Sequence, residues 1–328
     1  MIETREKLVE RIMVLNDRLW EGRVPRAKID EWLGNFTGKV TDIETERLHA
    51  LFWLSQFMYF GGREIRVLLK SLYRDLFFCP MIQEVRASLP ANASEQELMA
   101  AINAEVASTR FFGVGNPSES GVHLLYYFRQ ENGLSKDNFM DAVQIFNREN
   151  TNGQPGARTL RNPNIKRYIF LDDICGSGDT AVSYSKEVIY DLLQLNPDAK
   201  VAYHSLFATV DGLDNIRSET LFKENCSAVY ELDASYRCAS VGSRYFKTAD
   251  YPAIDPVMAC RIAKEYGEIL GYASAHACGY NDSQMLMGFH HNTPDNTLPI
   301  MWHDHMSHQG NAWNPIFKRY PKISGGSL

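Results

Sequence analysis

The segment YIFLDDICGSGDTA, residues 168–181, decides the fold that this sequence predicts. Tyr168–Leu171 is short, apolar and β-prone, as expected for a strand buried on both faces of a mostly parallel sheet. Asp172 and Asp173 follow at its carboxyl end, the edge at which open α/β sheets bind ligands. Two adjacent acids that close an apolar strand are difficult to explain as packing. We therefore expect them to contact a ligand.

A small-residue loop and a predicted helix follow the two acids. The loop Gly176–Gly178 lets the backbone approach an anion closely, and Thr180 adds a hydroxyl where a helix over 181–193 is expected to begin. Because carboxylates repel phosphate, we expect Asp172 and Asp173 to accept hydrogen bonds from ribose hydroxyls, with magnesium nearby. The segment therefore predicts a site for a ribose 5-phosphate group.

Over this segment the chain resembles the type I phosphoribosyltransferases. Their signature is a hydrophobic strand, two acids, two apolar residues, here Ile174 and Cys175, and a loop rich in Thr, Ser and Gly. The resemblance implies that Asp172 and Asp173 hold the ribose 2′ and 3′ hydroxyls of phosphoribosyl pyrophosphate (PRPP). It also implies that five loop residues wrap the 5-phosphate, namely Gly176, Ser177, Gly178, Asp179 and Thr180.

One position departs from that pattern. Gly176 stands where the 6-oxopurine enzymes of the superfamily have an aspartate general base, and Asp179 stands where other members often have Gly or Lys. Purine salvage of that kind is therefore not expected.

More of the chain resembles the bacterial phosphoribosyltransferase-like proteins of conflict systems, called PRTase-CE. The likeness rests on HLLYYFRQENGL from His123, on the central segment, and on GYNDSQMLMGFHHNTPDNTLPIMW from Gly279. It implies an effector of antiphage defence, and some such proteins are encoded beside retron reverse transcriptases. A complex of reverse transcriptase and multicopy single-stranded DNA (msDNA) is therefore an expected partner.

Two other interpretations of the loop stay open. GSGDTA fits the G-x-G-x-x-A form of a dinucleotide fingerprint, and LDDICGSG is similar to the first motif of Rossmann-like methyltransferases. A methyltransferase would need glycine at Ile174, and a dinucleotide fold would place its acid after the next strand rather than at Asp191, within the predicted helix. Asp211 does follow that next strand, Val201–Thr209, and keeps both alternatives open.

Composition sets the broad class. The 328 residues are 45% hydrophobic, enough for a substantial core. A formal net charge of −6 argues against general affinity for nucleic acid. The six cysteines form no C-x-x-C pair, and the charged start MIETREKLVER is neither a signal peptide nor a membrane span. We expect a cytoplasmic protein that does not engage a membrane.

The organisation changes near residue 110. Residues 1–110 predict a helical module, with capping boxes at Thr41/Glu44 and Ser94/Glu97, a helix over Arg63–Phe78 and apolar surfaces suited to a homo-oligomer. Residues 111–328 predict an α/β domain of the phosphoribosyltransferase type with a C-terminal elaboration.

Within the α/β part, predicted short strands alternate with predicted helices, a pattern typical of βαβ units. His123–Arg129 predicts a strand and Lys136–Asn147 a helix. The loop Phe112–Gly121 is expected to place N–H groups against a second phosphate cluster. The polar connection 149–164 predicts a flexible loop whose Arg158 and Arg161 either reach a pyrophosphate or remain solvated.

The C-terminal part is rich in side chains that can bind ligands. Its histidines are His290, His291, His303, His305 and His308. Their spacing, with Asp304, is compatible with zinc, but the polar residues around them favour an exposed loop. A second group combines stacking with hydrogen bonding and would suit a nucleobase or another acceptor: Tyr280, Asn281, Asp282 and Gln284.

Together these features predict an enzyme that binds PRPP or a nucleotide, with Mg²⁺ as cofactor, and that transfers or hydrolyses at ribose C1. The second hypothesis is a non-catalytic subunit that senses the same ligand or binds a partner. The acceptor is not evident from the sequence.

Overall fold

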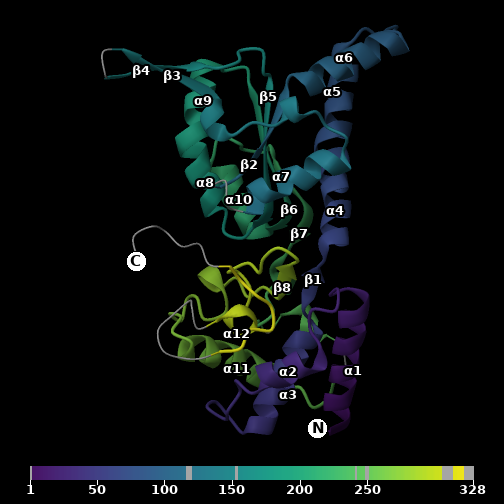
Figure 1. The fold of residues 1–328 in the computed structure, drawn as a ribbon, viewed down its shortest axis with the longest axis vertical. Coiled ribbons are helices and arrows are strands. Elements are labelled where there is room, and N and C mark those ends of the chain that lie inside the picture. Colours follow the sequence, from purple (N-terminus) through teal and green to yellow (C-terminus); the bar gives the residue numbers. More distant parts are fainter. Residues whose placement is uncertain are drawn as a thin grey trace. The chain divides into compact units, whose positions relative to one another are not determined.

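The computed structural model describes residues 2–115, 120–151, 154–240, 242–247, 251–304 and 313–320. Contacts divide the chain into two compact units, which are taken one at a time. Unit 1 joins Met1–Ile65 to Asp233–Leu328, and unit 2 is Arg66–Leu232 (Figure 1). The division differs from a boundary near residue 110, because helices after Ile65 pack with the sheet of unit 2 and the first 65 residues pack with the C-terminal part.

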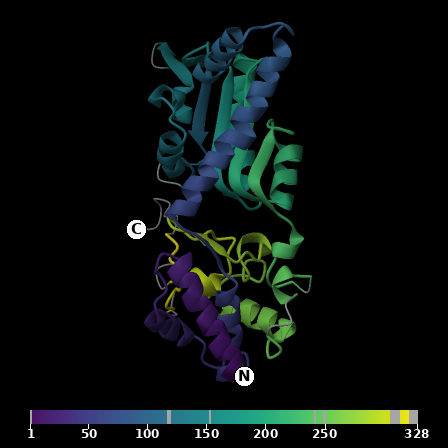
Figure 2. The ribbon, with the colours of Figure 1, turned by 90° about the vertical axis from the view of Figure 1, so that its right-hand side faces the viewer.

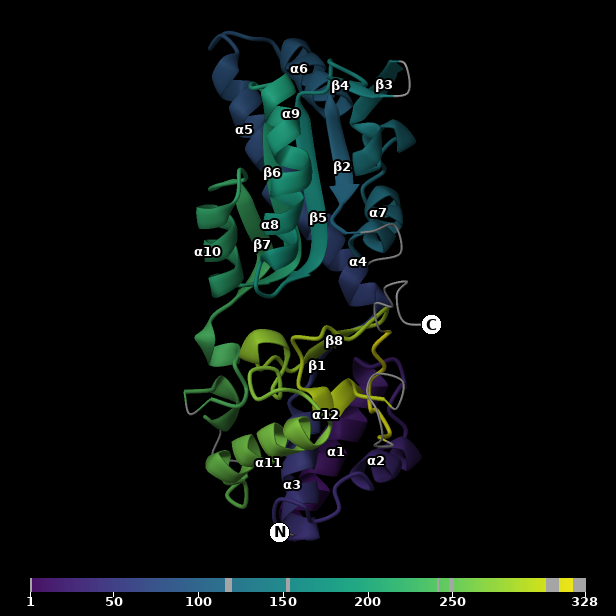
Figure 3. The same ribbon diagram turned by 90° about the vertical axis from the view of Figure 1, so that its left-hand side faces the viewer.

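Unit 2 is built on a parallel sheet. Its strands are β2 (Thr109–Gly113), β5 (Arg167–Cys175), β6 (Lys200–Thr209) and β7 (Cys226–Leu232), in the order β2-β5-β6-β7. Every neighbouring pair is parallel, so the four carboxyl ends share one edge (Figure 3). The predicted α/β class is confirmed, and so are the strands at Tyr168–Leu171 and Val201–Thr209.

Aromatic side chains fill the core beside this sheet. Phe112 on β2 stacks on Phe170 of β5 with ring centroids 4.9 Å apart, and Phe222 packs edge-on to Phe170. All three rings are fully buried. These rings lie on one face of the sheet, and successive residues of β5 from Arg167 to Leu171 are all buried, so both faces of the strand are covered; this explains why β5 is a near-continuous apolar run.

Helices cover both faces of the sheet. A helical run of α4 (Gly62–Ser71), the π-helical η1 (Leu72–Phe78) and α5 (Cys79–Ser88) crosses one face (Figure 2). The run contains the predicted helix Arg63–Phe78 and extends it. On the other face lie α8 (Asp179–Tyr184), the π-helical η4 (Ser185–Ile189) and α9 (Tyr190–Leu195), as shown in Figure 3. They confirm the helix expected over 181–193, with a π-helical segment inside it.

The remaining elements of unit 2 include α6 (Glu95–Ala107), α7 (Ser120–Glu131) and α10 (Val210–Glu219). The capping box at Ser94/Glu97 is present. The strand predicted at His123–Arg129 is wrong, because this segment lies in α7. Its buried Leu124 and Phe128 recur at helical spacing, and this periodicity prevails over the β preference of the aromatic residues.

The segment after α7 also differs from expectation. Instead of a helix, 136–147 contains the 3₁₀ turns η2 (Lys136–Asn138) and η3 (Ala142–Gln144) and the start of a strand. β3 (Phe146–Thr151) pairs antiparallel with β4 (Gln154–Leu160). The predicted flexible connection is therefore largely a hairpin, and its residues 152–153 lie outside the described part.

Unit 1 is mainly helical. It contains α1 (Ile2–Arg18), α2 (Arg26–Leu33), α3 (Ile43–Ser55), α11 (Pro256–Ile269) and α12 (Pro299–Trp302). Parallel strands β1 (Met58–Phe60) and β8 (Met287–Phe289) join its two sequence segments. Short 3₁₀ turns are η5 (Ala234–Tyr236), η6 (Arg244–Phe246) and η7 (Tyr280–Asp282).

One predicted cap in unit 1 is wrong by one residue. Asp42, not Thr41, caps α3, and its side chain accepts from the Thr45 N–H at 2.9 Å. A carboxylate is a better cap at this position because it also bears a charge opposite to the helix N-terminal dipole. Among the described residues, no helix combines the length and apolar character needed to cross a membrane.

Candidate functional site

Strand β5 carries the two predicted acids to the carboxyl edge of the sheet. Asp172 pairs with Ser205 of β6, and Ile174 pairs with Phe207. Between them, the Asp173 N–H donates to Oδ1 of Asp172 at 2.9 Å, and the Ile174 N–H donates to Oδ1 of Asp173 at 2.9 Å. Each side chain therefore folds back onto the next backbone N–H, and the pair is held in a fixed geometry at the end of the strand.

A tyrosine from the neighbouring strand holds the first acid. The Tyr203 hydroxyl donates to Oδ2 of Asp172 at 3.0 Å. Burial raises the pKa of Asp172 well above its ordinary value, and the adjacent Asp173 carboxylate raises that pKa further. Tyr203 is also deeply buried, and burial beside Asp172 raises the pKa of its phenol. The arrangement therefore favours the protonated form of Asp172 more than in a free aspartate.

The loop after the acids is fixed by α10. Gly178, with φ +83°, is the residue before α8, and a Cβ at this position would lie 2.8 Å from the Gly212 carbonyl. The Thr209 hydroxyl donates to the Gly176 carbonyl, and Asn215 Nδ2 donates to the Ser177 carbonyl at 2.7 Å. Because carbonyls are held on the α10 side, the loop conformation is defined without a ligand.

The other predicted loop residues surround this turn. Ser177 Oγ donates to Oδ2 of Asp179 at 2.7 Å, and both Asp179 and Thr180 are exposed in the first turn of α8. Ile174 is half-buried. Cys175 is buried, and burial raises the pKa of its thiol to about 12. At neutral pH this cysteine is a packed thiol and not a nucleophile.

The second predicted loop begins beside the same acids. Gly113, the last residue of β2, pairs with Leu171, and the Val114 N–H donates to the Leu171 carbonyl at 2.9 Å. Residues 116–119 of this loop lie outside the described part of the chain. The described ends place the loop at the carboxyl edge, adjoining the residue before Asp172, where it leads into α7.

The two predicted arginines lie elsewhere. Arg158 on β4 forms an ion pair with Asp191 of α9, and its guanidinium lies 5.4 Å from the centroid of the Phe146 ring. Arg161 is exposed, and its N–H donates to the Ile145 carbonyl at 2.9 Å. In Figure 3, β4 and α9 lie at the end of the sheet opposite to the turn between β5 and α8. The structure does not bring these arginines to the two acids.

The C-terminal candidates belong to unit 1. His303 is buried, with Nδ1 3.1 Å from the Tyr272 hydroxyl, and Asp282 forms an ion pair with Arg237 at 2.9 Å. Tyr280 stacks on His276 with centroids 5.2 Å apart. His305 and His308 lie outside the described residues. Within the described ranges, no group of three or more His, Cys, Asp or Glu side chains is placed to hold a metal.

Sequence reasoning missed three residues of the site: Tyr203, Thr209 and Asn215. The sequence predicts the strand that contains Tyr203, but the contact of this residue with Asp172 depends on the register between β5 and β6. Thr209 carries a local signal, because it caps α10 by accepting from the Gly212 N–H at 2.9 Å.

Comparisons with solved structures gave low-similarity matches. One is a Helicobacter pylori xanthine-guanine-hypoxanthine phosphoribosyltransferase, with 12% identity and TM-score 0.28 over 54% of this chain and 84% of that one. A hypothetical protein from Neisseria gonorrhoeae with bound ppGpp has 11% identity and TM-score 0.28 over 55% and 86%. The AQ2163 protein from Aquifex aeolicus has 13% identity and TM-score 0.28 over 63% and 80%. A comparison with curated proteins gave no match.

The family comparison is decisive. The PRTase-CE family model matches residues 29–319, which include the strand β5, the two acids and the glycine loop as well as most of unit 1. The match confirms the resemblance found in the sequence and supports a phosphoribosyltransferase-like function. The chain belongs to the PRTase-CE family.

Proposed function

We propose that this protein binds PRPP or a nucleotide and transfers or hydrolyses at ribose C1. The 5-phosphate lies against the turn Gly176–Thr180, and the ribose hydroxyls donate to Asp172 and Asp173. One observation carries the proposal: the glycine turn is held by Thr209 and Asn215 directly after a fixed pair of carboxyl groups. Such a turn before a helix offers N–H groups to a phosphate, and the acids offer acceptors to a diol.

Magnesium fits this site as an ion shared with the substrate. Mg²⁺ binds phosphate substrates through one or two carboxylates and several other oxygens, so Asp172 and Asp173 suffice on the protein side. Asp172 and Asp173 would hold such an ion, which would supply positive charge to a leaving pyrophosphate. The protein residues orient the ribose, and the fixed turn holds the phosphate while C1 gains positive charge.

A second candidate is a subunit that binds the same ligand without turnover. The absence of a side chain at Gly176 favours it, because this position supplies the general base in the 6-oxopurine enzymes that the chain resembles. Asp172 offers a partial substitute, since burial raises its pKa above the ordinary carboxyl value and makes it a stronger base than a free aspartate. Binding and turnover must therefore be measured separately.

The biological part of the proposal rests on family membership. We propose a cytoplasmic effector of bacterial antiphage defence, which modifies or depletes nucleotides when triggered. Its partners include other proteins of the defence system, such as a reverse transcriptase bound to its msDNA, and a second copy of this chain in a homo-oligomer.

The test is calorimetric titration of PRPP with and without magnesium, on the wild type and on the Asp172→Asn/Asp173→Asn double variant. Asp198→Asn is a matched control, because this exposed aspartate precedes β6 at the opposite end of the sheet. We expect magnesium-dependent binding that the double variant loses and the control retains. Release of pyrophosphate from bound PRPP supports the enzyme, and binding without release supports the sensing subunit. Equal binding by the double variant would contradict both.

A further inference from the structure

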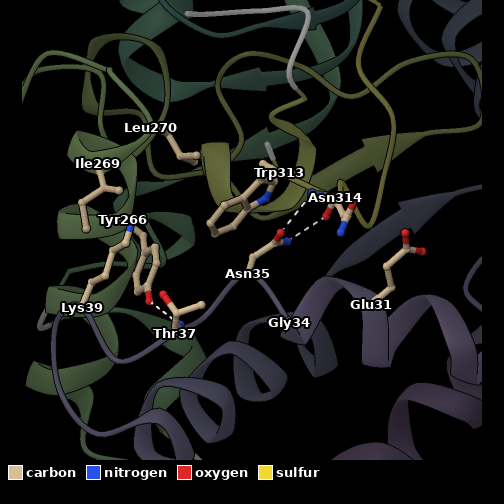
Figure 4. A pocket seen from close by; sticks show the side chains of 10 residues that line it. All are labelled: Glu31, Gly34, Asn35, Thr37, Lys39, Tyr266, Ile269, Leu270, Trp313 and Asn314. Carbon is tan, nitrogen blue, oxygen red and sulfur yellow. Dashed lines mark hydrogen bonds between the residues drawn. The ribbon is translucent and has the colours of Figure 1, made fainter. Parts of the chain in front are cut away.

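The largest side chains around the cavity of unit 1 are already engaged within the protein. This cavity has a volume of about 350 Å³ and is shown in Figure 4. Trp313 and Leu270 are 5% and 3% exposed, so they present no apolar face to a ligand. The Tyr266 hydroxyl donates to Oε2 of Glu46 at 2.6 Å and accepts from the Thr37 N–H at 3.0 Å. These contacts are explained by packing alone, and the exposed charge with a consequence for a ligand lies instead at the glycine turn of unit 2.

That charge belongs to Asp179, the first residue of α8, whose side chain is exposed. The Ser177 hydroxyl donates to its Oδ2 at 2.7 Å, and Ser177 Oγ accepts from the Asp179 N–H at 3.4 Å. The carboxylate is therefore folded back toward the turn. Its charge also acts within the turn, because it adds to burial and to the Asp172 charge in raising the pKa of the Cys175 thiol. The proposed function places the 5-phosphate against these same residues.

The turn offers a phosphate its backbone N–H groups and few other donors. The carbonyls of Gly176 and Ser177 are held on the α10 side by Thr209 and Asn215, which leaves the N–H groups of the turn for a ligand. The Ser177 hydroxyl is already bonded to Asp179. Because N–H groups of a turn attract an anion but carry no full positive charge, they do not neutralise a phosphate with two negative charges.

No lysine or arginine in the adjoining segments of unit 2 compensates for this carboxylate. The segments that follow β2, β5 and β6 at the carboxyl edge are residues 114–122, 176–185 and 210–216, and their sequences contain no Lys or Arg. Arg217, the next residue of α10, forms an ion pair with Asp214 at 2.8 Å. A doubly charged phosphate at the turn is therefore repelled by Asp179 and attracted by no cation from these segments.

We propose that Asp179 selects a nucleotide whose 5-phosphate is esterified and carries a single negative charge, as in a dinucleotide. This inference rests on the proposed function, which places the 5-phosphate at the turn. A phosphate monoester carries nearly two charges at about pH 8, because its second ionisation lies near about pH 6, whereas a diester carries one. The preferred ligand is a dinucleotide with a free ribose diol. PRPP and nucleoside monophosphates have a monoester at this position and bind less tightly.

The test compares two ligands that differ by one charge, adenosine 5′-monophosphate and its methyl ester. Calorimetric titration at about pH 8 measures their dissociation constants. Neither ligand carries a pyrophosphate, so magnesium is left out. We expect the wild type to bind the methyl ester more tightly. Asp179→Asn removes the charge but keeps an oxygen that accepts from Ser177, and it is expected to lower the ratio of the two dissociation constants, monophosphate over ester, about fivefold, the effect of one unit charge at short range in water.

A control variant and a third ligand complete the test. Asp198→Asn removes an exposed carboxylate at the opposite end of the sheet and is expected to leave the ratio unchanged. Diadenosine diphosphate, a dinucleotide joined through its two 5′-phosphates, is expected to bind the wild type at least as tightly as the methyl ester. Weaker binding of this dinucleotide than of the monophosphate would overturn the proposed ligand class.

The Asp172→Asn/Asp173→Asn variant separates this inference from the proposed function. If the wild type binds neither adenine nucleotide, or if this variant binds both as tightly as the wild type, the proposed function fails and the role of Asp179 fails with it. If binding depends on the two acids but the wild type prefers the monophosphate, or Asp179→Asn leaves the ratio unchanged, the role of Asp179 alone is overturned and the ribose phosphate site stands.

Discussion

The Tyr203 hydroxyl donates a 3.0 Å hydrogen bond to Oδ2 of Asp172, across the boundary between strands β6 and β5. Oδ1 of the same carboxyl group accepts from the Asp173 N–H. Both oxygens are therefore engaged, and the orientation of Asp172 is set before any ligand arrives. This bond also opposes the effect of burial, because a donor stabilises the ionised carboxyl group and lowers its pKa.

Removing that donor tests its role. Tyr203→Phe keeps the buried ring but leaves Oδ2 of Asp172 without this bond, so we expect the pKa of Asp172 to rise further. The loss of one hydrogen bond between the buried Tyr203 and the half-buried Asp172 is expected to destabilise the protein by about 1–3 kcal/mol. At neutral pH, PRPP affinity is expected to fall as well. Calorimetry and urea unfolding measure the two effects, with Tyr190→Phe, at an exposed tyrosine of α9, as the control. Unchanged affinity over the whole pH range would show that Tyr203 only packs.

The raised pKa of Asp172 predicts a pH dependence of ligand binding. Ribose hydroxyls donate to an ionised carboxyl group, so affinity is expected to decrease as pH falls through the raised pKa of Asp172. Dissociation constants for PRPP measured over a series of decreasing pH values follow this step. The phosphate groups of PRPP also titrate, and the Asp172→Asn variant reports their contribution alone. If wild type and variant show parallel profiles, Asp172 does not titrate in this range.

The central βα unit could be predicted from sequence because its signals are local. The apolar run of β5, the two acids, the glycine turn and the following helix lie within 28 consecutive residues, 168–195. Each of these elements is recognisable from its own residues alone. In open α/β sheets, ligand-binding sites lie at the carboxyl ends of the strands, so the position of the site could be predicted as well. The same reasoning failed at α7, where Tyr126 and Tyr127 favour a strand in isolation and packing of Leu124 and Phe128 selects a helix.

Other parts of the site depend on long-range contacts that no local pattern encodes. The register that places Tyr203 beside Asp172 joins residues 31 apart in sequence. The bond from Thr209 to the Gly176 carbonyl joins residues 33 apart. Unit 1 is built from two distant segments of the chain, and its contacts span even longer separations. Trp53 Nε1, for example, donates to the carbonyl of Ala259, 206 residues away in sequence. Periodicity can indicate a single helix in this unit, but it does not indicate which helices pack together.

A substitution at Gly212 tests how strongly the position of the glycine turn depends on its contact with α10. A Cβ at this position would lie 2.4 Å from the Gly176 carbonyl oxygen and 2.9 Å from Thr209 Oγ1. Gly212→Ala should raise helix propensity, yet the clash with backbone is expected to displace the turn at a cost of about 1–3 kcal/mol. We therefore expect weaker PRPP binding with unchanged helix content by circular dichroism. Gly242→Ala is the control, because a Cβ there has no neighbour within 4 Å. Normal affinity in Gly212→Ala would show that the turn position is not critical.

Because His204 is buried, we expect the folding stability of unit 2 to decrease in acid. His204 lies on β6 with Nδ1 2.9 Å from Ser227 Oγ, and burial lowers the pKa of its imidazole to about 4. The unfolded chain therefore binds a proton more readily than the folded chain. The contribution of neutral His204 to folding stability is fully present above about pH 6.5, the pKa of histidine in the unfolded chain. It is lost as the pH falls toward about 4, the pKa of His204 in the folded chain. The loss amounts to roughly 3 kcal/mol at its limit.

Urea unfolding between these pH values measures this loss. His204→Gln removes the titrating group, so its unfolding midpoint is expected to vary less with pH than that of the wild type, even if the variant is less stable throughout. Asp172 acts in the opposite direction, because its raised folded pKa favours the folded state as pH falls. The slope for Asp172→Asn is therefore expected to be steeper than the wild-type slope. Identical slopes for all three proteins would contradict the burial effects at both residues, since each effect predicts a change of opposite sign.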